Sequence, residues 1–216
     1  MTPAALPIAL YFAAYIAGGI PFGVLVARMK GVDILSLGSA SPGATNVYRM
    51  VGPIPALIVF LLDLAKGFLP AYFGMRLLGS PEQGLACGVV AVVGHSFSPF
   101  LRFRGGKGVA TGFGVLLGIR PDVGLSAFGI FLIVLAIWRY VSLASISSAF
   151  ALIFFGWLYQ ASPVLMLAFV ALGGFVIYRH WSNVQRLLAG TERKLGSAPV
   201  VVESSADDVG LKGAGP

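Results

Sequence analysis

Long apolar runs separated by short polar breaks make up most of this chain. The runs fall at residues 4–27, 54–79, 84–101, 109–119, 121–138, 142–160 and 162–178. A helix rises about 1.5 Å per residue, so roughly 20 apolar residues cross the ~30 Å hydrocarbon core of a bilayer. The pattern therefore predicts an all-α integral membrane protein with seven transmembrane helices, some of them short.

The first and fourth runs are the least regular. In the first, Gly18-Gly19 and Pro21 predict a kink or a close contact covered by neighbouring helices. No basic residue precedes this run and no cleavage pattern closes it, which is typical of a retained span and not of a signal peptide. The run at 109–119 reaches about half of the hydrocarbon core. It is short, oblique or re-entrant, and five full spans are the alternative.

Composition agrees with the membrane assignment and narrows the chemistry. The chain has 216 residues, of which 57% are hydrophobic and 11% charged, with a mean hydropathy of +0.90. These values exclude an ordinary soluble domain. Cys87 is the single cysteine and two histidines lie far apart, so neither a disulfide framework nor a metal site is expected. Cations on cytosolic loops explain the net charge of +7 without a nucleic acid partner.

Cations on alternate loops give the orientation. In the seven-span arrangement two cations, Arg76 and Arg120, fall on one side and eleven on the other. The larger group consists of Arg28, Lys30, Arg49, Arg102, Arg104, Lys107, Arg139, Arg179, Arg186, Arg193 and Lys194. The positive-inside rule then places the amino terminus outside and the carboxyl terminus in the cytosol. We expect one membrane domain at 1–196 and a disordered cytosolic tail at 197–216, which lacks periodicity.

The break at 94–111, GHSFSPFLRFRGGKGVAT, is the most polar in the chain. Lys107 lies among Gly105, Gly106 and Gly108, and glycines let backbone N–H groups approach a ligand closely. The apolar run that resumes at Val109 predicts a helix N-terminus here, which favours anions. The composition predicts a phosphate-binding loop.

A second break, GSASPGATNVYR at 38–49, has similar features. Ser41 followed by Pro42 predicts a helix start, with serine as N-cap and proline at the first helical position. The alternative is a simple Gly/Ser turn. Arg49 falls on the same side of the membrane as Lys107, so two helix N-termini and two cations can converge.

Three further polar positions lie at or within the spans. Asp63 and Lys66 share a helical face, and a structural ion pair is favoured over a proton or cation carrier. His95, at the cytosolic end of its span, fits an interfacial hydrogen-bonded residue or a general base.

The last two breaks add hydroxyl, imidazole and amide groups. Ser142 and Ser145 lie in RYVSLASI and can bond a phosphate oxygen or the preceding helical turn. In YRHWSNVQRLLAGTE, His180 and Asn183 share one helical face opposite an apolar stripe. A basic helix lying on anionic lipid explains the arginines there, but not the paired histidine and asparagine.

Together the three motifs GSASPGATNVYR, GHSFSPFLRFRGGKGVAT and YRHWSNVQRLLAGTE resemble those of the PlsY family of bacterial acyl-phosphate:glycerol-3-phosphate acyltransferases. IPFG, DLAKG and RYVSLASI extend the resemblance over nearly the whole chain. The family patterns GSGNPGATN and His-x-Phe-Pro-Val-Phe differ here, becoming GSASPGATN and HSFSPF. The resemblance implies acyl transfer from acyl phosphate to the 1-hydroxyl of sn-glycerol 3-phosphate, giving lysophosphatidic acid and phosphate.

The resemblance and the charge pattern together give a predicted site. Catalytic residues are His180, Asn183, Lys107 and Arg49; substrate-binding residues are Ser39, Gly43, Thr45, Asn46, His95, Gly105, Gly106, Gly108, Ser142, Ser145 and Glu192. The resemblance implies no cofactor, no metal and no obligatory protein partner; the substrates and membrane lipid are the expected partners. It places the protein in the bacterial cytoplasmic (inner) membrane with a cytosolic active site.

The same residues bear on other functions. Lys107 lacks the flanking residues of a nucleotide-binding P-loop, since Leu101 and Gly108 occupy the relevant positions. A His-x-x-x-x-Asp acyltransferase pair is absent, because Phe100 and Gln185 stand at that spacing. A phosphate or organic-anion transporter is the rival function, and a membrane scaffold a weaker one. The proton acceptor stays open among His180, Glu192 and a substrate phosphate oxygen.

Overall fold

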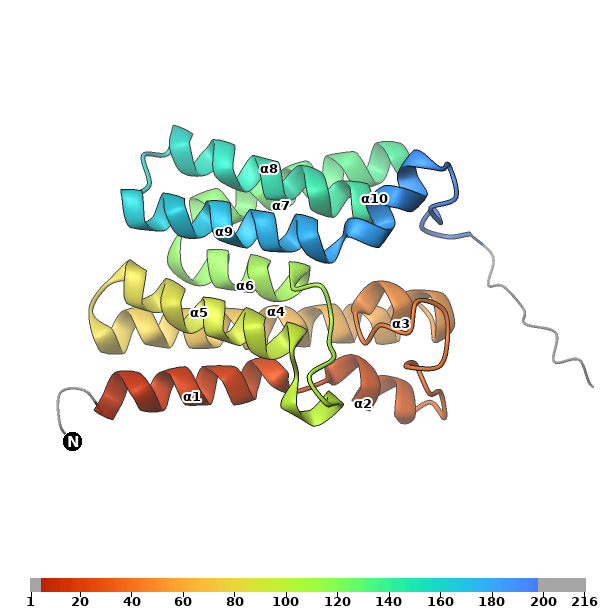
Figure 1. The fold of residues 1–216 in the computed structure, drawn as a ribbon, viewed down its shortest axis with the longest axis horizontal. Coiled ribbons are helices and arrows are strands. Elements are labelled where there is room, and N and C mark those ends of the chain that lie inside the picture. The colour runs from red at the N-terminus through yellow and green to blue at the C-terminus, as the bar shows by residue number, and fades with distance from the viewer. Residues whose placement is uncertain (1–4, 198–216) are drawn as a thin grey trace, which may run out of the picture.

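The computed structural model describes residues 5–197, which form a bundle of helices (Figure 1). The elements are α1 (Ala5–Gly19), α2 (Phe22–Arg28), α3 (Ala44–Met50), α4 (Pro53–Leu78), α5 (Pro81–Ser96), the 3-10 turn η1 (Pro99–Leu101), α6 (Val109–Ile119), α7 (Pro121–Trp138), α8 (Val141–Leu158), α9 (Pro163–Arg179) and α10 (Trp181–Leu188). The predicted tail at 197–216 lies outside the described residues except for Ser197.

Within residues 5–197, four stretches are long and apolar enough to cross a membrane. They are Ala5–Arg28, Pro53–Leu78, Pro121–Trp138 and Val141–Leu158. A fifth is added if α9 and α10, bent by 58° at their junction, count as one span. The helical, multi-pass prediction is confirmed. By length and composition this gives four or five spans, because α5 has 16 residues and α6 has 11.

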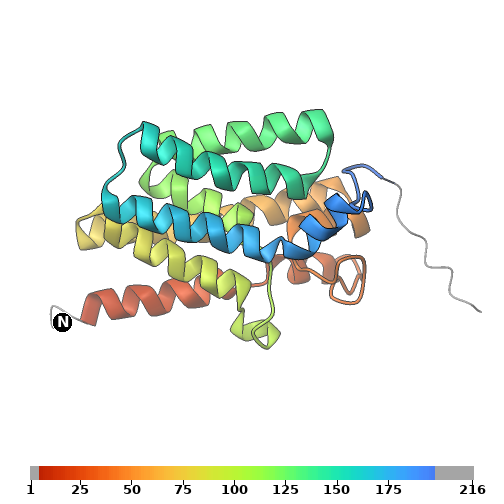
Figure 2. The same ribbon diagram turned by 45° about the horizontal axis from the view of Figure 1, so that its top comes forward.

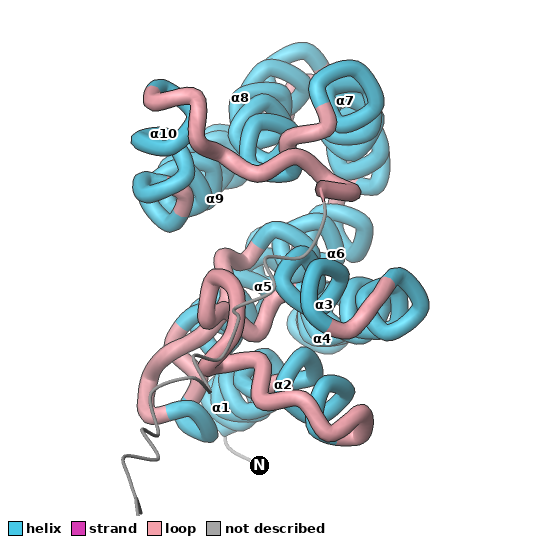
Figure 3. Tube along the Cα trace, turned by 90° about the vertical axis from the view of Figure 1, so that its right-hand side faces the viewer, coloured by secondary structure: helices cyan, strands magenta, loops and turns pink. Residues whose placement is uncertain are grey.

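The predicted irregularities in the first and fourth runs are present. The first span is broken between α1 and α2, at Ile20 and Pro21, next to the Gly18-Gly19 pair. α6 is the short helix expected over 109–119. It lies inside the bundle, packed against α4, α5 and α7, and most of its side chains are buried. Seen end-on, α6 separates α1, α2, α4 and α5 from α7, α8 and α9 (Figure 3).

Close backbone contact fixes the position of α6 against α4. A Cβ atom added to Gly67 of α4 would lie 2.0 Å from the carbonyl oxygen of Thr111, and one added to Gly114 of α6 would lie 2.0 Å from that of Leu64. No side chain fits at those distances, so glycine is required on both helices. The crossing holds the start of α6, and therefore the loop before it, beside α4.

The helix start predicted at Ser41 is wrong by two residues. α3 begins at Ala44 with Gly43 as its N-cap, and the Ser41 hydroxyl accepts a hydrogen bond from the Gly43 N–H instead. The Asn46 side chain explains the shift, because its amide nitrogen donates to the carbonyls of Ile34, Leu37 and Ser41. These bonds hold the preceding chain in a loop and leave α3 with seven residues.

We expect Gly67→Ala to lower the free energy of unfolding by about 1–3 kcal/mol, which is the usual effect of overpacking a close contact. Thermal unfolding in detergent measures the effect. Gly129→Ala is the matched control, because nothing lies within 4 Å of a Cβ at this position in α7. Equal unfolding temperatures for the two variants would contradict the close α4–α6 contact.

Candidate active site

The predicted motifs meet at one end of the bundle, at the right of Figures 1 and 2. A cavity of about 140 Å³ opens there. It lies between the loop before α3, the first half of α4, the end of α5, the start of α6 and the helices α8 to α10. Thirteen of the fifteen predicted residues line it: Arg49, Lys107, His180, Asn183, Ser39, Gly43, Thr45, Asn46, His95, Gly108, Ser142, Ser145 and Glu192. The convergence of distant breaks is therefore present in the structure.

Gly105 and Gly106 are the two predicted residues that do not line this cavity. They lie against His95 instead: the Gly106 N–H donates to the His95 carbonyl at 3.2 Å. A Cβ at Gly106 would lie 2.1 Å from His95 Nε2, and one at Gly105 would lie 2.1 Å from the His95 carbonyl oxygen. Their lack of side chains allows close packing against α5. Gly108 is the glycine that faces the cavity, as the N-cap of α6.

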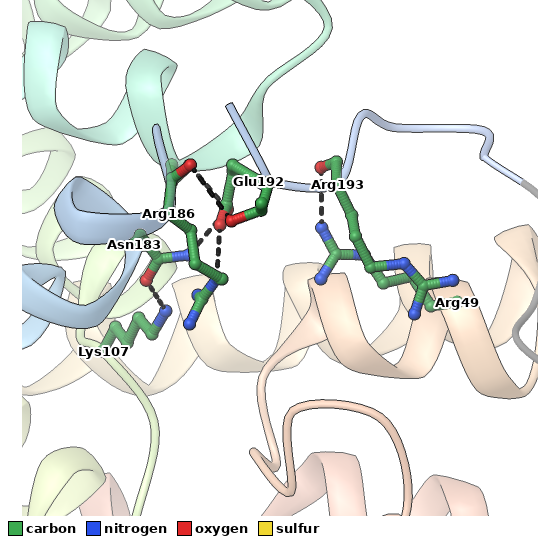
Figure 4. A network of polar contacts seen from close by, with 8 residues as sticks. Arg49, Lys107, Asn183, Arg186, Glu192 and Arg193 are labelled. Atoms are coloured by element: carbon green, nitrogen blue, oxygen red, sulfur yellow. Dashed lines mark hydrogen bonds and ion pairs between the residues drawn. The ribbon is translucent and has the colours of Figure 1, made fainter. Parts of the chain in front are cut away.

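A polar network joins Lys107 to the last helix (Figure 4). The Lys107 ammonium donates to Asn183 Oδ1, and Asn183 Nδ2 donates to Glu192 Oε1 at 2.7 Å. Ser142 Oγ donates to the same carboxylate oxygen at 2.8 Å, and Arg186 Nε donates to Oε2 at 2.7 Å. Glu192 thus connects α8 to α10 and orients Asn183 toward Lys107.

Burial and neighbouring charge tune the groups of this network. Burial works to raise the pKa of the Glu192 carboxyl, but its hydrogen bonds with Asn183, Ser142 and Arg186 outweigh burial and leave the pKa below its ordinary value. Burial lowers the pKa of Lys107 to about 8, with Glu192 opposing and nearby arginines adding to the decrease. Glu192 is therefore ionised at neutral pH, and Lys107 loses its charge in mildly alkaline solution.

His180 lies just beyond the last residue of α9, with 3% of its surface exposed. Its Nδ1 is 2.8 Å from the Val176 carbonyl oxygen, a contact that requires a hydrogen on Nδ1. Burial, with Lys107 adding to it, lowers the pKa of His180 to about 4. In the neutral ring, Nε2 is then a hydrogen-bond acceptor.

Arg49 contributes a second cation from α3. Its terminal nitrogen donates to the Arg193 carbonyl at 3.1 Å. Its Nε is buried and has no hydrogen-bond partner within the described part of the chain. Burial lowers the pKa of this guanidinium, although arginine stays charged at physiological pH. The guanidinium brings a positive charge to the wall of the cavity.

Asp63 and Lys66 form the ion pair favoured from the sequence, with Nζ 2.7 Å from Oδ1. The Lys66 ammonium also donates to the Ile20 carbonyl at 2.8 Å, at the break between α1 and α2. His95 Nδ1 lies 3.8 Å from the same Asp63 oxygen. Asp63 thus pairs with Lys66, and the pair holds α4 to the break in the first span.

Comparison with known proteins decides the family. Residues 8–190 match the family model described as glycerol-3-phosphate acyltransferase. The chain belongs to this family. The glycerol-3-phosphate acyltransferase of Thermosynechococcus vestitus is 45% identical, with 92% of this chain and 99% of that one covered.

Solved structures agree. The crystal structure of PlsY, an integral membrane glycerol 3-phosphate acyltransferase, in its glycerol 3-phosphate form matches with a TM-score of 0.85 and 37% identity over 89% of this chain and 96% of that one. Its lysophosphatidic acid form matches with a TM-score of 0.83 and 37% identity over 88% and 95% of the two chains. The protein is thus a multi-pass membrane glycerol-3-phosphate acyltransferase.

Two features of the site were missed in the sequence. Arg186 lines the cavity and binds Glu192. It lies three residues after Asn183, a spacing that places the two on one helical face, so the signal was present. Phe60 and Phe131 also line the cavity. They lie inside apolar runs, where no local pattern distinguishes a cavity wall from a lipid contact.

We expect Glu192→Gln to destabilise the protein by about 1–3 kcal/mol, because the amide leaves a donor facing the donors Asn183 and Arg186. Thermal unfolding in detergent checks this. Glu82→Gln is the control, since Glu82 accepts from Ser162 at the opposite end of the bundle and is far less enclosed. A larger effect at Glu82 than at Glu192 would contradict the connecting role of Glu192.

Proposed function

We propose that the protein transfers a fatty acyl group from acyl phosphate to the 1-hydroxyl of sn-glycerol 3-phosphate, releasing phosphate. The observation that carries this is the joining of a cationic cavity to an apolar groove. The cavity contains Arg49 and Lys107, and it shares Gly108, Val109 and Ser145 with a second cavity of about 30 Å³. An anionic head and the first few carbons of an alkyl tail fit this combination.

The second cavity lies between α6, α7, α8 and α9. Small and aliphatic residues line it, including Gly112, Ala149, Leu152 and Gly173. When the first carbons of an acyl chain lie there, the carbonyl carbon lies near Gly108 and Lys107. Apolar walls favour the chain through ordinary hydrophobic burial, and the phosphate remains among the cations.

Charge neutralisation is the main catalytic effect that we propose. The two substrates bring two phosphate groups, each with close to two negative charges, into one cavity. Arg49, Lys107 and Arg186 offset this repulsion and stabilise the phosphate as it leaves. Acyl phosphate is a mixed anhydride with a good leaving group, so positioning and charge suffice without a strong base.

In the proposed reaction the glycerol 1-hydroxyl oxygen bonds to the acyl carbonyl carbon, and the bond from that carbon to the phosphate oxygen breaks. His180 Nε2 and Asn183 hold the attacking hydroxyl. The pKa of Glu192 lies below its ordinary value and its oxygens accept from Asn183, Ser142 and Arg186, so we assign this carboxylate a positioning role and not that of the proton acceptor. The hydroxyl proton passes to His180 Nε2 or directly to a phosphate oxygen, which leaves as phosphate.

We further propose seven spans, by adding α5, α6 and α9 to the four long stretches. The end of the bundle that holds the cavity carries Arg28, Lys107, Arg139 and Arg186. Arg76 lies in the last turn of α4, at the other end. The positive-inside rule then puts the cavity on the cytosolic face of the bacterial inner membrane. Residues 1–196 are proposed to form one domain.

The first test incubates purified protein with palmitoyl phosphate and labelled glycerol 3-phosphate. We expect labelled lysophosphatidate and an equal amount of phosphate, and a loss of at least about 10²-fold in Lys107→Ala and His180→Ala, typical of removing a charge or proton-transfer group. Arg28→Gln removes an exposed charge on the same face and should retain wild-type turnover. Binding without acylated product would favour the transporter alternative.

The pH dependence gives a second test. Lys107 is charged below its pKa of about 8 and neutral above it, so kcat/KM should fall as the pH rises through 8. Initial rates from pH 6.5 to 10, corrected for enzyme-free hydrolysis, measure this. In Lys107→Arg the guanidinium stays charged, so any remaining activity should lack the decrease near pH 8. A wild-type profile flat to pH 10 would remove Lys107 from the charge role.

A further inference from the structure

Arg179, the last residue of α9, contacts the loop that carries Lys107. One terminal nitrogen of its guanidinium donates to the Gly105 carbonyl at 3.2 Å and to the Gly106 carbonyl at 2.9 Å. These are the two carbonyls directly before Lys107. The guanidinium also lies over the ring of Phe97, 5.6 Å from its centroid. Arg179 does not line the substrate cavity.

His95 holds the same two glycines from the other direction. Its carbonyl accepts from the Gly106 N–H, and its ring fills the space where a Gly106 side chain would stand. The segment is therefore fixed from α5 through the Gly106 N–H and from α9 through two carbonyls. A loop of two glycines has high intrinsic freedom, and Lys107 follows it directly. These two sets of contacts fix the backbone from which the Lys107 ammonium reaches Asn183.

The structure assigns to Arg179 the role of a positioning residue for acyl transfer: its contacts with Gly105 and Gly106 hold the Lys107 ammonium where the leaving phosphate forms. This rests on the proposed function, because it takes Lys107 as the cation of that phosphate. Because His180 is the next residue, one helix end sets the positions of the histidine and of the lysine together.

Arg179 also contributes charge near Lys107. The groups that face Lys107 are Glu192, Arg186, Arg49, Arg179 and His180, with Asp63 and His95 on the wall formed by α4 and α5. Glu192 raises the pKa of Lys107, whereas Arg186, Arg49 and Arg179 add to the decrease caused by burial. Loss of the Arg179 charge therefore raises the pKa of Lys107.

The test uses full-length protein with palmitoyl phosphate and glycerol 3-phosphate, beginning with the wild type. Arg179→Met removes both the donor and the charge. We expect kcat to fall roughly 10²-fold, as misplacement by about 1 Å does, with a smaller change in KM. The alkaline limit of kcat/KM should move to higher pH. Arg179→Lys keeps a charged donor and should restore most of kcat, with the alkaline limit at its wild-type position.

The outcomes separate this role from a purely structural one. The role would be overturned if Arg179→Met gave less folded protein but a normal kcat per folded molecule and an unchanged alkaline limit of kcat/KM. It would also be overturned if Arg179→Lys were as impaired as Arg179→Met. If Arg179→Met does not fold, the same measurements are made on Arg179→Gln, which removes the charge and keeps an amide donor. Arg28→Gln is the charge-matched control. Wild-type protein that makes no lysophosphatidate would instead refute the proposed function.

Discussion

Repulsion among cations is the constraint on which the rest of this structure depends. Arg49, Lys107 and Arg186 line one partly buried cavity, where charges of like sign interact more strongly than in water. Glu192 is the carboxylate that offsets them there, through contacts from α8 and α10. The balance leaves a net positive space, which suits anionic substrates. Burial, with the nearby arginines adding to it, lowers the pKa of Lys107 to about 8.

Much of the fold could be predicted from the sequence, because apolar length and period are local properties. The short helix at 109–119 and the break near Gly18-Gly19 were both present in the residue pattern. The start of α3 was not, since it depends on Asn46 reaching back to Ile34 and Leu37. Contacts of this kind join residues that no local rule connects.

The same distinction applies to the site: some of its features follow from local motifs, and others depend on contacts with distant residues. The resemblance to the family motifs predicted that Lys107, His180 and Asn183 would meet, and they line one cavity. The glycine pair before Lys107 has a different surrounding from the predicted anion loop, because its neighbours, His95 and Arg179, come from other helices. A glycine in the sequence indicates that another group packs closely against the backbone there, but it does not show which group.

The contact between Lys66 and the Ile20 carbonyl satisfies a backbone group at the break in the first span. A broken helix exposes backbone carbonyls that hydrocarbon cannot satisfy, and here a lysine from α4 supplies the missing donor. Its own charge is met by Asp63, which also lines the cavity. The interruption of the first span is thus satisfied from within the protein, so the Ile20 carbonyl needs no hydrogen bond from water.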